Sequence, residues 1–307
     1  MSTHDLAVAP LLAAVGQEAV ALLASGSAAL ESALEVLEIG PGHEVIVPDV
    51  GCHCVGAAVV RRSATPVFVA VGPGLTLTPD DVILGLSTAT RCVICVHQYG
   101  LPCDVEAVRK VLPAGVVVLE DFAQAWGLSV RGRVAGSLGD LSVTSFGPTK
   151  PVSLGAGGAL LGPSQLLRDV AGPADRARTA ARPPSGARFP MPLLPGLPGA
   201  VAAADAALAN RRESVRRILT AVRDRGWEPP ATEGSEPSWT RLPLYPLTAN
   251  AGVEVVAEAD GVKAIQGMHR VRPASLPMFS GHPTRRAGRP ATVPEPILVQ
   301  PAEKDVS

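Results

Sequence analysis

One lysine stands in a setting that suits covalent chemistry. The chain has only four lysines among its 27 basic residues: Lys110, Lys150, Lys263 and Lys304. Three of them lie in segments typical of a solvated helix, a loop or a tail, whereas Lys150 lies in an apolar turn punctuated by glycine and proline. A desolvated lysine loses its proton far more readily than an arginine, which is why Schiff-base chemistry uses it. A surface loop lysine remains the plain alternative for this residue considered alone.

The segment around Lys150 predicts how it is held. Residues 141–146 alternate as in a short strand, a turn follows, and a glycine-rich run ends at Gly158. Pro151 disfavours helical geometry at the residue before it, so we expect Lys150 in an extended or turn conformation.

The elements that must position this lysine alternate along the first half of the chain. Helical patterns are followed by short apolar runs, as in βαβ units with a parallel sheet covered on both faces. We expect strands at 44–48, 65–71, 91–96 and 115–119, and helices at 6–24, 25–37, 55–62, 77–86 and 105–111. The predicted fold class is therefore α/β.

Several chemically capable side chains directly follow these strands. They are Cys52, His53, His97, Asp121 and Lys150. Ligands of parallel α/β sheets bind beyond the carboxyl ends of the strands, so this arrangement favours a site at that edge. Ser25-Gly26-Ser27 also opens a helix with an N-cap residue, and such an end can bind phosphate through its amides. An ordinary capped helix is the alternative there.

The second half of the chain has a different character. Prolines and glycines dominate residues 172–199, where we place a connecting loop or domain boundary, and a long basic helical pattern covers 200–226. We expect a large α/β domain at 1–170, and a connecting segment, long helix and small C-terminal α+β domain at 171–307. A brief strand is expected at 241–245, and the tail beyond Arg285 has little to pack.

The composition of the chain narrows the kinds of partner that we expect. The net charge of −1 gives no reason to expect nucleic acid or an anionic membrane, and no secretory signal or membrane-spanning run is visible, so we expect a cytoplasmic protein. Cys92 and Cys95 form a C-x-x-C pattern on a predicted strand. Residues three apart on a strand face opposite sides, so we expect two core residues and no metal site or disulfide.

The order of these motifs resembles the DegT/DnrJ/StrS group of sugar aminotransferases, which depend on pyridoxal phosphate (PLP) and have fold type I. The similarity covers about residues 20–162 and is carried by the runs SGSAALESALEVLEIGPGHEVIVP, VHQYGLPCDVEAV, VVVLEDFAQAWG and GSLGDLSVTSFGPTKPVSLGAGGAL. It implies a mostly parallel sheet and a homodimer with its active site at the interface.

The resemblance also implies roles for individual residues. Lys150 would carry the cofactor as a Schiff base, and Asp121 would pair with the pyridinium nitrogen, keeping the ring an electron sink. Gln124 would touch the 3-hydroxyl of the ring. The phosphate would be held by Gly26, Ser27, Ala28 and Ser145.

Two departures from the family pattern stand out. An aromatic side chain usually stacks on the cofactor ring, whereas Cys52 and the neighbouring His53 are the candidates here. A partner-subunit asparagine usually contacts the phosphate, and Arg188 stands there instead, able to make a charge-assisted contact. The chain is also shorter than usual at both ends.

The resemblance implies transfer of an amino group from glutamate or glutamine to a keto-sugar or keto-cyclitol in sugar or natural-product biosynthesis. A different PLP reaction, such as elimination or decarboxylation, is one alternative, motivated by the altered stacking position. A non-catalytic scaffold homologue is the other, motivated by the abbreviated termini.

Overall fold

The computed structural model describes residues 2–168, 170, 188–223, 226–247, 263–265, 279, 282–287 and 296–300. Its helices are α1 Thr3–Val15, α2 Gly26–Val36, α3 His53–Arg61, α4 Pro79–Gly85, α5 Val105–Lys110, α6 Ser164–Leu167 and α7 Leu197–Arg223, with 3₁₀ turns η1 Gln98–Gly100 and η3 Met191–Gly196. Its strands are β1 Ala19–Leu23, β2 Glu44–Pro48, β3 Thr65–Val69, β4 Thr90–Val96, β5 Val117–Asp121, β6 Ser129–Val130, β7 Arg133–Val134, β8 Leu141–Ser145, β9 Gly158–Gly162, β10 Trp227–Glu228, β11 Ser235–Glu236, β12 Leu242–Pro246, β13 Lys263–Ile265, β14 Arg285–Ala287 and β15 Ile297–Gln300.

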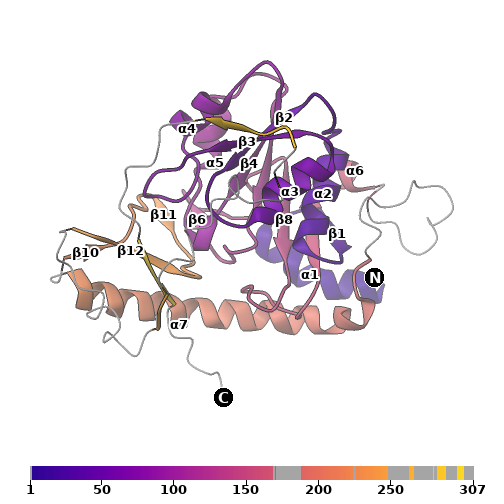
Figure 1. Ribbon diagram of the computed structural model, residues 1–307. Helices are drawn as coiled ribbons and strands as arrows, with labels where there is room; N and C mark the ends of the chain where they lie inside the picture. Colours follow the sequence, from indigo (N-terminus) through magenta and orange to yellow (C-terminus); the bar gives the residue numbers. More distant parts are fainter. Residues whose placement is uncertain are drawn as a thin grey trace.

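A mostly parallel sheet organises the fold. Its order is β1-β9-β8-β5-β4-β2-β3-β14, and the strands from β14 to β8 pair parallel, while β9 pairs antiparallel with both β8 and β1. The carboxyl ends of β2, β4, β5 and β8 therefore meet at one edge. The predicted α/β class is confirmed, and helices surround the sheet in Figure 1.

The sheet is covered on both faces by apolar side chains. One core cluster joins it to α2 and α3, and the other joins it to α1, α5 and α7. Cys92 belongs to the first cluster and Cys95 to the second, and both are fully buried. The expectation that they face opposite sides of a strand is confirmed.

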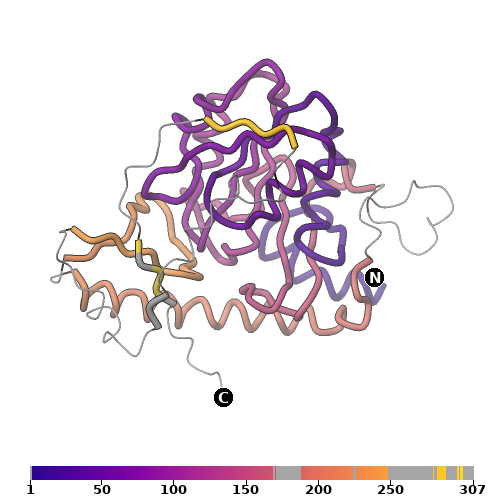
Figure 2. The backbone as a smooth tube through the Cα atoms, viewed as in Figure 1, coloured from indigo at the N-terminus to yellow at the C-terminus, as the bar shows by residue number. Residues whose placement is uncertain are grey.

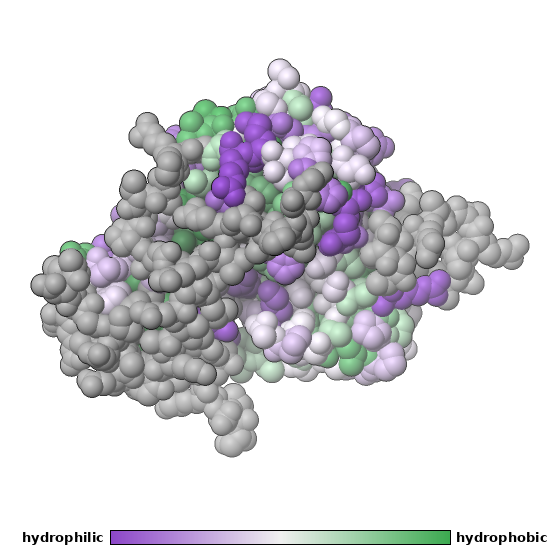
Figure 3. All heavy atoms as spheres, in the orientation of Figure 1, coloured by the Kyte–Doolittle hydropathy of each residue, from purple (hydrophilic) through white to green (hydrophobic). Residues whose placement is uncertain are grey.

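The long helix α7 runs along the base of the molecule and packs on α1 (Figures 1 and 2). The helical stretch Met191–Arg223 is long enough to cross a membrane, and one 18-residue window within it has a mean hydropathy of 1.3. Sequence inspection gave no such run. Figure 3 shows hydrophilic and hydrophobic residues interspersed on the described part of one face, with hydrophobic atoms gathered at the edge where α4 lies.

The structure corrects two expectations. The helix expected over 6–24 ends at Val15, and Ala19–Leu23 forms the strand β1, because the chain reverses at the left-handed Gly16 and then pairs with β9. The tail expected to have little to pack contributes β14 to the large sheet and β15 to a small sheet of order β10-β12-β15-β13. Leu298 and Val299 in β15 are fully buried. The segment expected as a connecting loop lies largely outside the described residues.

Candidate active site

The start of α2 and the end of β8 form a tight cradle. Ser25 caps the helix by accepting the Ala28 amide at 3.1 Å. A Cβ added at Gly26 would lie 2.7 Å from the Ser145 Cβ, so only glycine allows this approach. The structure thus brings Gly26 and Ser145 together, with Ser27 between the glycine and Ala28. An anion at this helix end would meet the partial positive charge of the macrodipole and the Ser145 hydroxyl.

Lys150 stands in the turn that follows β8. Its amide donates to the Gly147 carbonyl at 3.0 Å, and the Gly147 amide donates to the Ser145 side chain at 3.3 Å. The turn is anchored by Phe146, which is fully buried and packs edge-on against Phe189. The expected turn conformation is confirmed, and the half-buried lysine lies beside the Ser145 cradle.

Asp121 closes β5 within the electrostatic reach of Lys150. Burial raises the pKa of the Asp121 carboxyl, and the charge on Lys150 only partly opposes that rise. The Asp121 Oδ1 accepts the Ala123 amide at 3.0 Å. The neighbouring groups offset only part of the cost of burying a charge on this carboxylate. A cationic group of a ligand would therefore bind well beside it.

Gln124 lies next to a residue that sequence inspection missed. Its Nε2 donates to the Gln98 Oε1 at 3.4 Å, and Gln98 is buried. A Cβ at Gly51 would meet that same Oε1 at 2.6 Å, so Gln98 links the ends of β2, β4 and β5. Its position directly after the β4 strand and His97 was the available signal.

Cys52 and His53, the candidates for the position that stacks on the cofactor ring, stand exposed at the start of α3. Lys150 is among the groups that lower the pKa of Cys52, so this helix start faces the same site as the lysine. Neither position holds a phenylalanine, tyrosine or tryptophan. Arg188, also exposed, pairs through its backbone with Leu23, two residues before the Ser25 cap.

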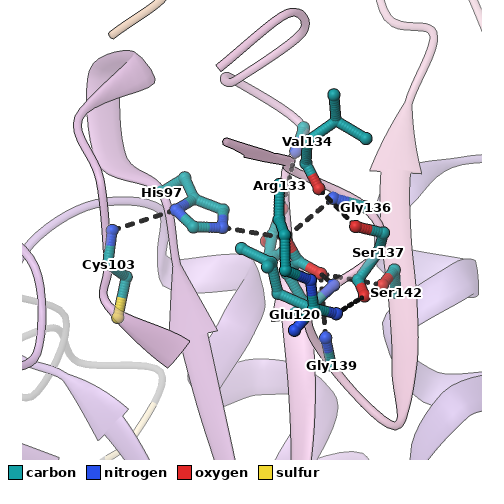
Figure 4. Close-up of polar contacts among 12 residues, drawn as sticks. His97, Cys103, Glu120, Arg133, Val134, Gly136, Ser137, Gly139 and Ser142 are labelled. Atoms are coloured by element: carbon teal, nitrogen blue, oxygen red, sulfur yellow. Dashed lines mark hydrogen bonds and ion pairs between the residues drawn. The ribbon is translucent and has the colours of Figure 1, made fainter. Parts of the chain in front are cut away.

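His97 was expected at the site edge, but it is fully buried beneath it (Figure 4). Its Nδ1 accepts the Cys103 amide at 3.0 Å, so the proton sits on Nε2, which lies 2.9 Å from the Glu120 Oε1. The Glu120 carboxylate also accepts hydrogen bonds from the amides of Gly136, Leu138 and Gly139 and from the Ser142 hydroxyl. Glu120 thereby ties β5, which ends in Asp121, to the loop that leads into β8.

Glu120 should make the fold sensitive to acid. Burial opposes its ionisation, but the hydrogen bonds from His97 and the loop amides outweigh burial and lower the pKa of Glu120. A lowered folded-state pKa contributes stability above the unfolded value of about 4.3, and this contribution is lost as the pH falls through the folded value. We expect Glu120→Gln to cost about 3–5 kcal/mol of unfolding free energy at pH 7, because the amide NH₂ would replace one carboxylate oxygen and face the two donors on Oε1 or the three on Oε2. Urea denaturation at pH 7 and pH 4 measures both effects.

The exposed Glu228 provides the matched control, since Glu228→Gln should leave the unfolding free energy within about 0.5 kcal/mol of the parent. A Glu120→Gln protein as stable as the parent at pH 7 would contradict the structural role given to this carboxylate.

Comparison with known proteins shows which family the chain belongs to. The sequence model of the DegT/DnrJ/EryC1/StrS aminotransferase family matches residues 9–172, more than half of the chain. The chain belongs to this family. The matched region of this DegT/DnrJ/EryC1/StrS member contains the cradle residues Gly26 and Ser145 as well as Asp121 and Lys150.

Curated relatives of this family member share its first half. The UDP-N-acetyl-3-dehydro-α-D-glucosamine 3-aminotransferase of Acidithiobacillus ferrooxidans is 42% identical over 137 residues, which are 44% of this chain and 37% of the relative. The L-glutamine:2-deoxy-scyllo-inosose aminotransferase of Streptoalloteichus tenebrarius is 39% identical over 140 residues, 45% of this chain and 33% of the relative. The matched region thus spans about a third of the length of these relatives.

Solved structures of the family resemble the whole chain. DesV of S. venezuelae, solved in complex with a ketimine intermediate, superposes with a TM-score of 0.82 at 26% identity, covering 98% of this chain and 84% of DesV. A DegT/DnrJ/EryC1/StrS aminotransferase from Brucella abortus has a TM-score of 0.83 at 21% identity, covering 100% and 87%, which shows the fold. The family and its structural neighbours are PLP-dependent aminotransferases.

Proposed function

We propose that this protein is a PLP-dependent aminotransferase that moves an amino group from glutamate or glutamine to a keto-sugar or keto-cyclitol. The observation that carries the proposal is the placement of Lys150, Asp121 and the Gly26–Ser145 cradle at one edge of the sheet. An amine, a buried carboxylate and an anion-binding helix end are the three functional groups that pyridoxal phosphate requires.

The residues present fit this cofactor. The close approach of Gly26 to Ser145 leaves backbone and hydroxyl donors for its phosphate, to which Ser27 and Arg188 add donors, while the Ala28 amide already bonds the Ser25 cap. The undercompensated carboxylate of Asp121 fits a protonated ring nitrogen, and Gln124 would hold the 3-hydroxyl. Bound there, pyridoxal phosphate supplies an electron sink that stabilises negative charge at the carbon beside the amino group.

The chain itself contributes attachment and proton transfer. Lys150 would hold the cofactor aldehyde and, once released, move a proton at the donor's α-carbon as a general base. Asp121 would keep the ring nitrogen protonated. Cys52 and His53 would border the ring where an aromatic residue is usual, which leaves more room on that side.

The acceptor class rests on the relatives. Those described above act on a keto-amino-sugar nucleotide and a keto-cyclitol by their names, so the acceptor proposed here is a cyclic ketone bearing hydroxyl groups. A cytoplasmic homodimer with a shared active site, and a division near residue 170 into a large cofactor-binding domain and a small C-terminal domain, complete the proposal.

The test is a half-reaction followed by absorbance. Protein loaded with pyridoxal phosphate is mixed with L-glutamate, L-glutamine and other amino acids in turn. We expect the absorbance of bound pyridoxal phosphate to convert to that of pyridoxamine phosphate with glutamate or glutamine. Loss of the α-carboxylate or β-substituent of an amino acid without that conversion would favour decarboxylation or elimination, and binding without any change would favour the scaffold reading.

A further inference from the structure

Two thiols meet at the first turn of α3, and the proposed transamination uses neither as an acid, base or nucleophile. Cys52 is the N-cap of the nine-residue helix and is exposed, while Cys54 is half-buried. The Cys54 amide donates to the Cys52 Sγ at 3.4 Å. One sulfur is thus open to solvent, and a second, half-buried thiol lies two residues further along the same helix turn.

The surroundings give the two thiols opposite protonation states. The Cys54 thiol donates a hydrogen bond to the Cys52 sulfur, and this contact, the helix amide and the charges of His53 and Lys150 outweigh burial and lower the pKa of Cys52 to about 6. The same contact and burial raise the pKa of Cys54 well above its usual range. At neutral pH Cys52 is therefore a thiolate beside a protonated thiol.

We infer that Cys52 and Cys54 form a peroxide-sensitive thiol pair, in which Cys52 is the oxidised sulfur and Cys54 resolves it as a disulfide. Exposed thiolates placed next to a resolving cysteine are the ones that peroxides oxidise selectively. Residues two apart have Cα atoms no more than about 7.6 Å apart, and the turned N-cap backbone brings them nearer, toward the usual disulfide span of about 4.4–6.8 Å. This inference does not depend on the proposed function.

The chemistry balances with hydrogen peroxide as the named oxidant. The Cys52 thiolate attacks one peroxide oxygen, the O–O bond breaks, and Cys52 becomes a sulfenic acid as hydroxide leaves. The Cys54 sulfur then attacks the Cys52 sulfur, the S–O bond breaks, and the Cys54 proton leaves with the hydroxyl group as water. Because the Cys52 anion no longer stands beside it, Cys54 loses its proton more readily at that stage. Two thiols and one peroxide give one disulfide and two waters.

The disulfide would change the proposed cofactor site. It removes a negative charge from the neighbourhood of Lys150 and ties down the first turn of α3, which borders that lysine. The other three cysteines, Cys92, Cys95 and Cys103, are fully buried and serve as internal controls.

The first measurement is the alkylation rate of Cys52 in cofactor-free, reduced protein, followed by peptide mass spectrometry from pH 4.5 to 9.5. We expect a midpoint near pH 6 and, at pH 6, alkylation about tenfold faster than that of an unstructured cysteine peptide. At pH 6 the thiolate fraction of Cys52 should be more than about 100 times that of a peptide thiol with the usual pKa of about 8.5. The lower nucleophilicity of a thiolate with a low pKa reduces this advantage in rate by about tenfold. Cys54→Ala removes the donor and should raise the midpoint by more than one pH unit. A parent midpoint above pH 8 would overturn the inference.

The second measurement is peroxide titration with peptide mapping. We expect the peptide that holds both cysteines to lose two hydrogen masses and to recover them with dithiothreitol. Cys54→Ser keeps a hydroxyl donor beside the thiolate, so its midpoint should stay low, yet its oxidation should stop at the sulfenic acid or its higher oxides. Cys52→Ser should be inert at low peroxide. A Cys52 that passes to sulfinic acid in the parent without forming the disulfide would reject Cys54 as its partner.

Discussion

Lys150→Ala is expected to abolish amino transfer and the absorbance of lysine-bound pyridoxal phosphate while leaving the fold intact. The side chain is half-buried in a turn whose backbone bonds and Phe146 anchor do not involve it, so the substitution removes only the amine. The loss combines the covalent attachment and the general base, and a positioned base alone contributes about 10²–10⁴-fold. Steady-state rates with glutamate and an absorbance scan measure the two effects.

Lys110 is the matched control, because it is exposed at the end of α5. Lys110→Ala should keep the absorbance band and the rate within about twofold of the parent. A Lys150→Ala protein that retains both the band and measurable turnover would remove this lysine from the site.

Asp121→Asn is expected to bind the cofactor and lose about 10²–10³-fold in turnover. The isosteric amide can keep the Ala123 hydrogen bond through its oxygen, but it cannot hold a proton on the ring nitrogen. Loss of one preorganised electrostatic partner has an effect of that size. Turnover in the parent range would show that Asp121 does not face the ring nitrogen.

The same substitution should stabilise the cofactor-free protein, a result that no loss of folding could imitate. Burial raises the pKa of Asp121, so its contribution to stability is favourable below the unfolded value of about 3.9 and is lost as the pH rises through the folded value. At pH 7 the ionised carboxylate therefore costs stability, which the neutral amide removes. Thermal unfolding without cofactor should show a higher Tm for Asp121→Asn at pH 7, with the difference shrinking toward pH 3.5. A lower Tm at pH 7 would contradict the burial argument.

The parts of the fold that local patterns determine could be predicted from the sequence. The strands β2, β4 and β8 and the helix α2 follow from apolar runs and caps. The carboxyl ends of parallel strands lie at one edge of a sheet. The placement of Asp121 and Lys150 after two such strands therefore predicted that they would share a site. The turn at Lys150 followed from the proline after it.

The missed features depend on contacts between distant segments. Ala19–Leu23 is apolar enough for either helix or strand, and pairing with β9 decides the outcome. The 285–287 and 297–300 strands depend on neighbours that no local pattern reveals. His97 looked like a site residue because histidine after a strand often is, but Glu120 and the Cys103 amide bind it beneath the site. Gln98 lies in the run VHQYGLPCDVEAV, but its contact with Gln124 and its close approach to Gly51 depend on the folded chain.

The most direct test of the account is to locate the attachment point of the cofactor. Protein incubated with pyridoxal phosphate is reduced with borohydride, digested and analysed by peptide mass spectrometry, with the four lysines of the chain as the candidate positions. The account predicts one pyridoxyl group per chain, on Lys150. A label on Lys110, Lys263 or Lys304 in its place, or no label at saturating cofactor, would contradict it.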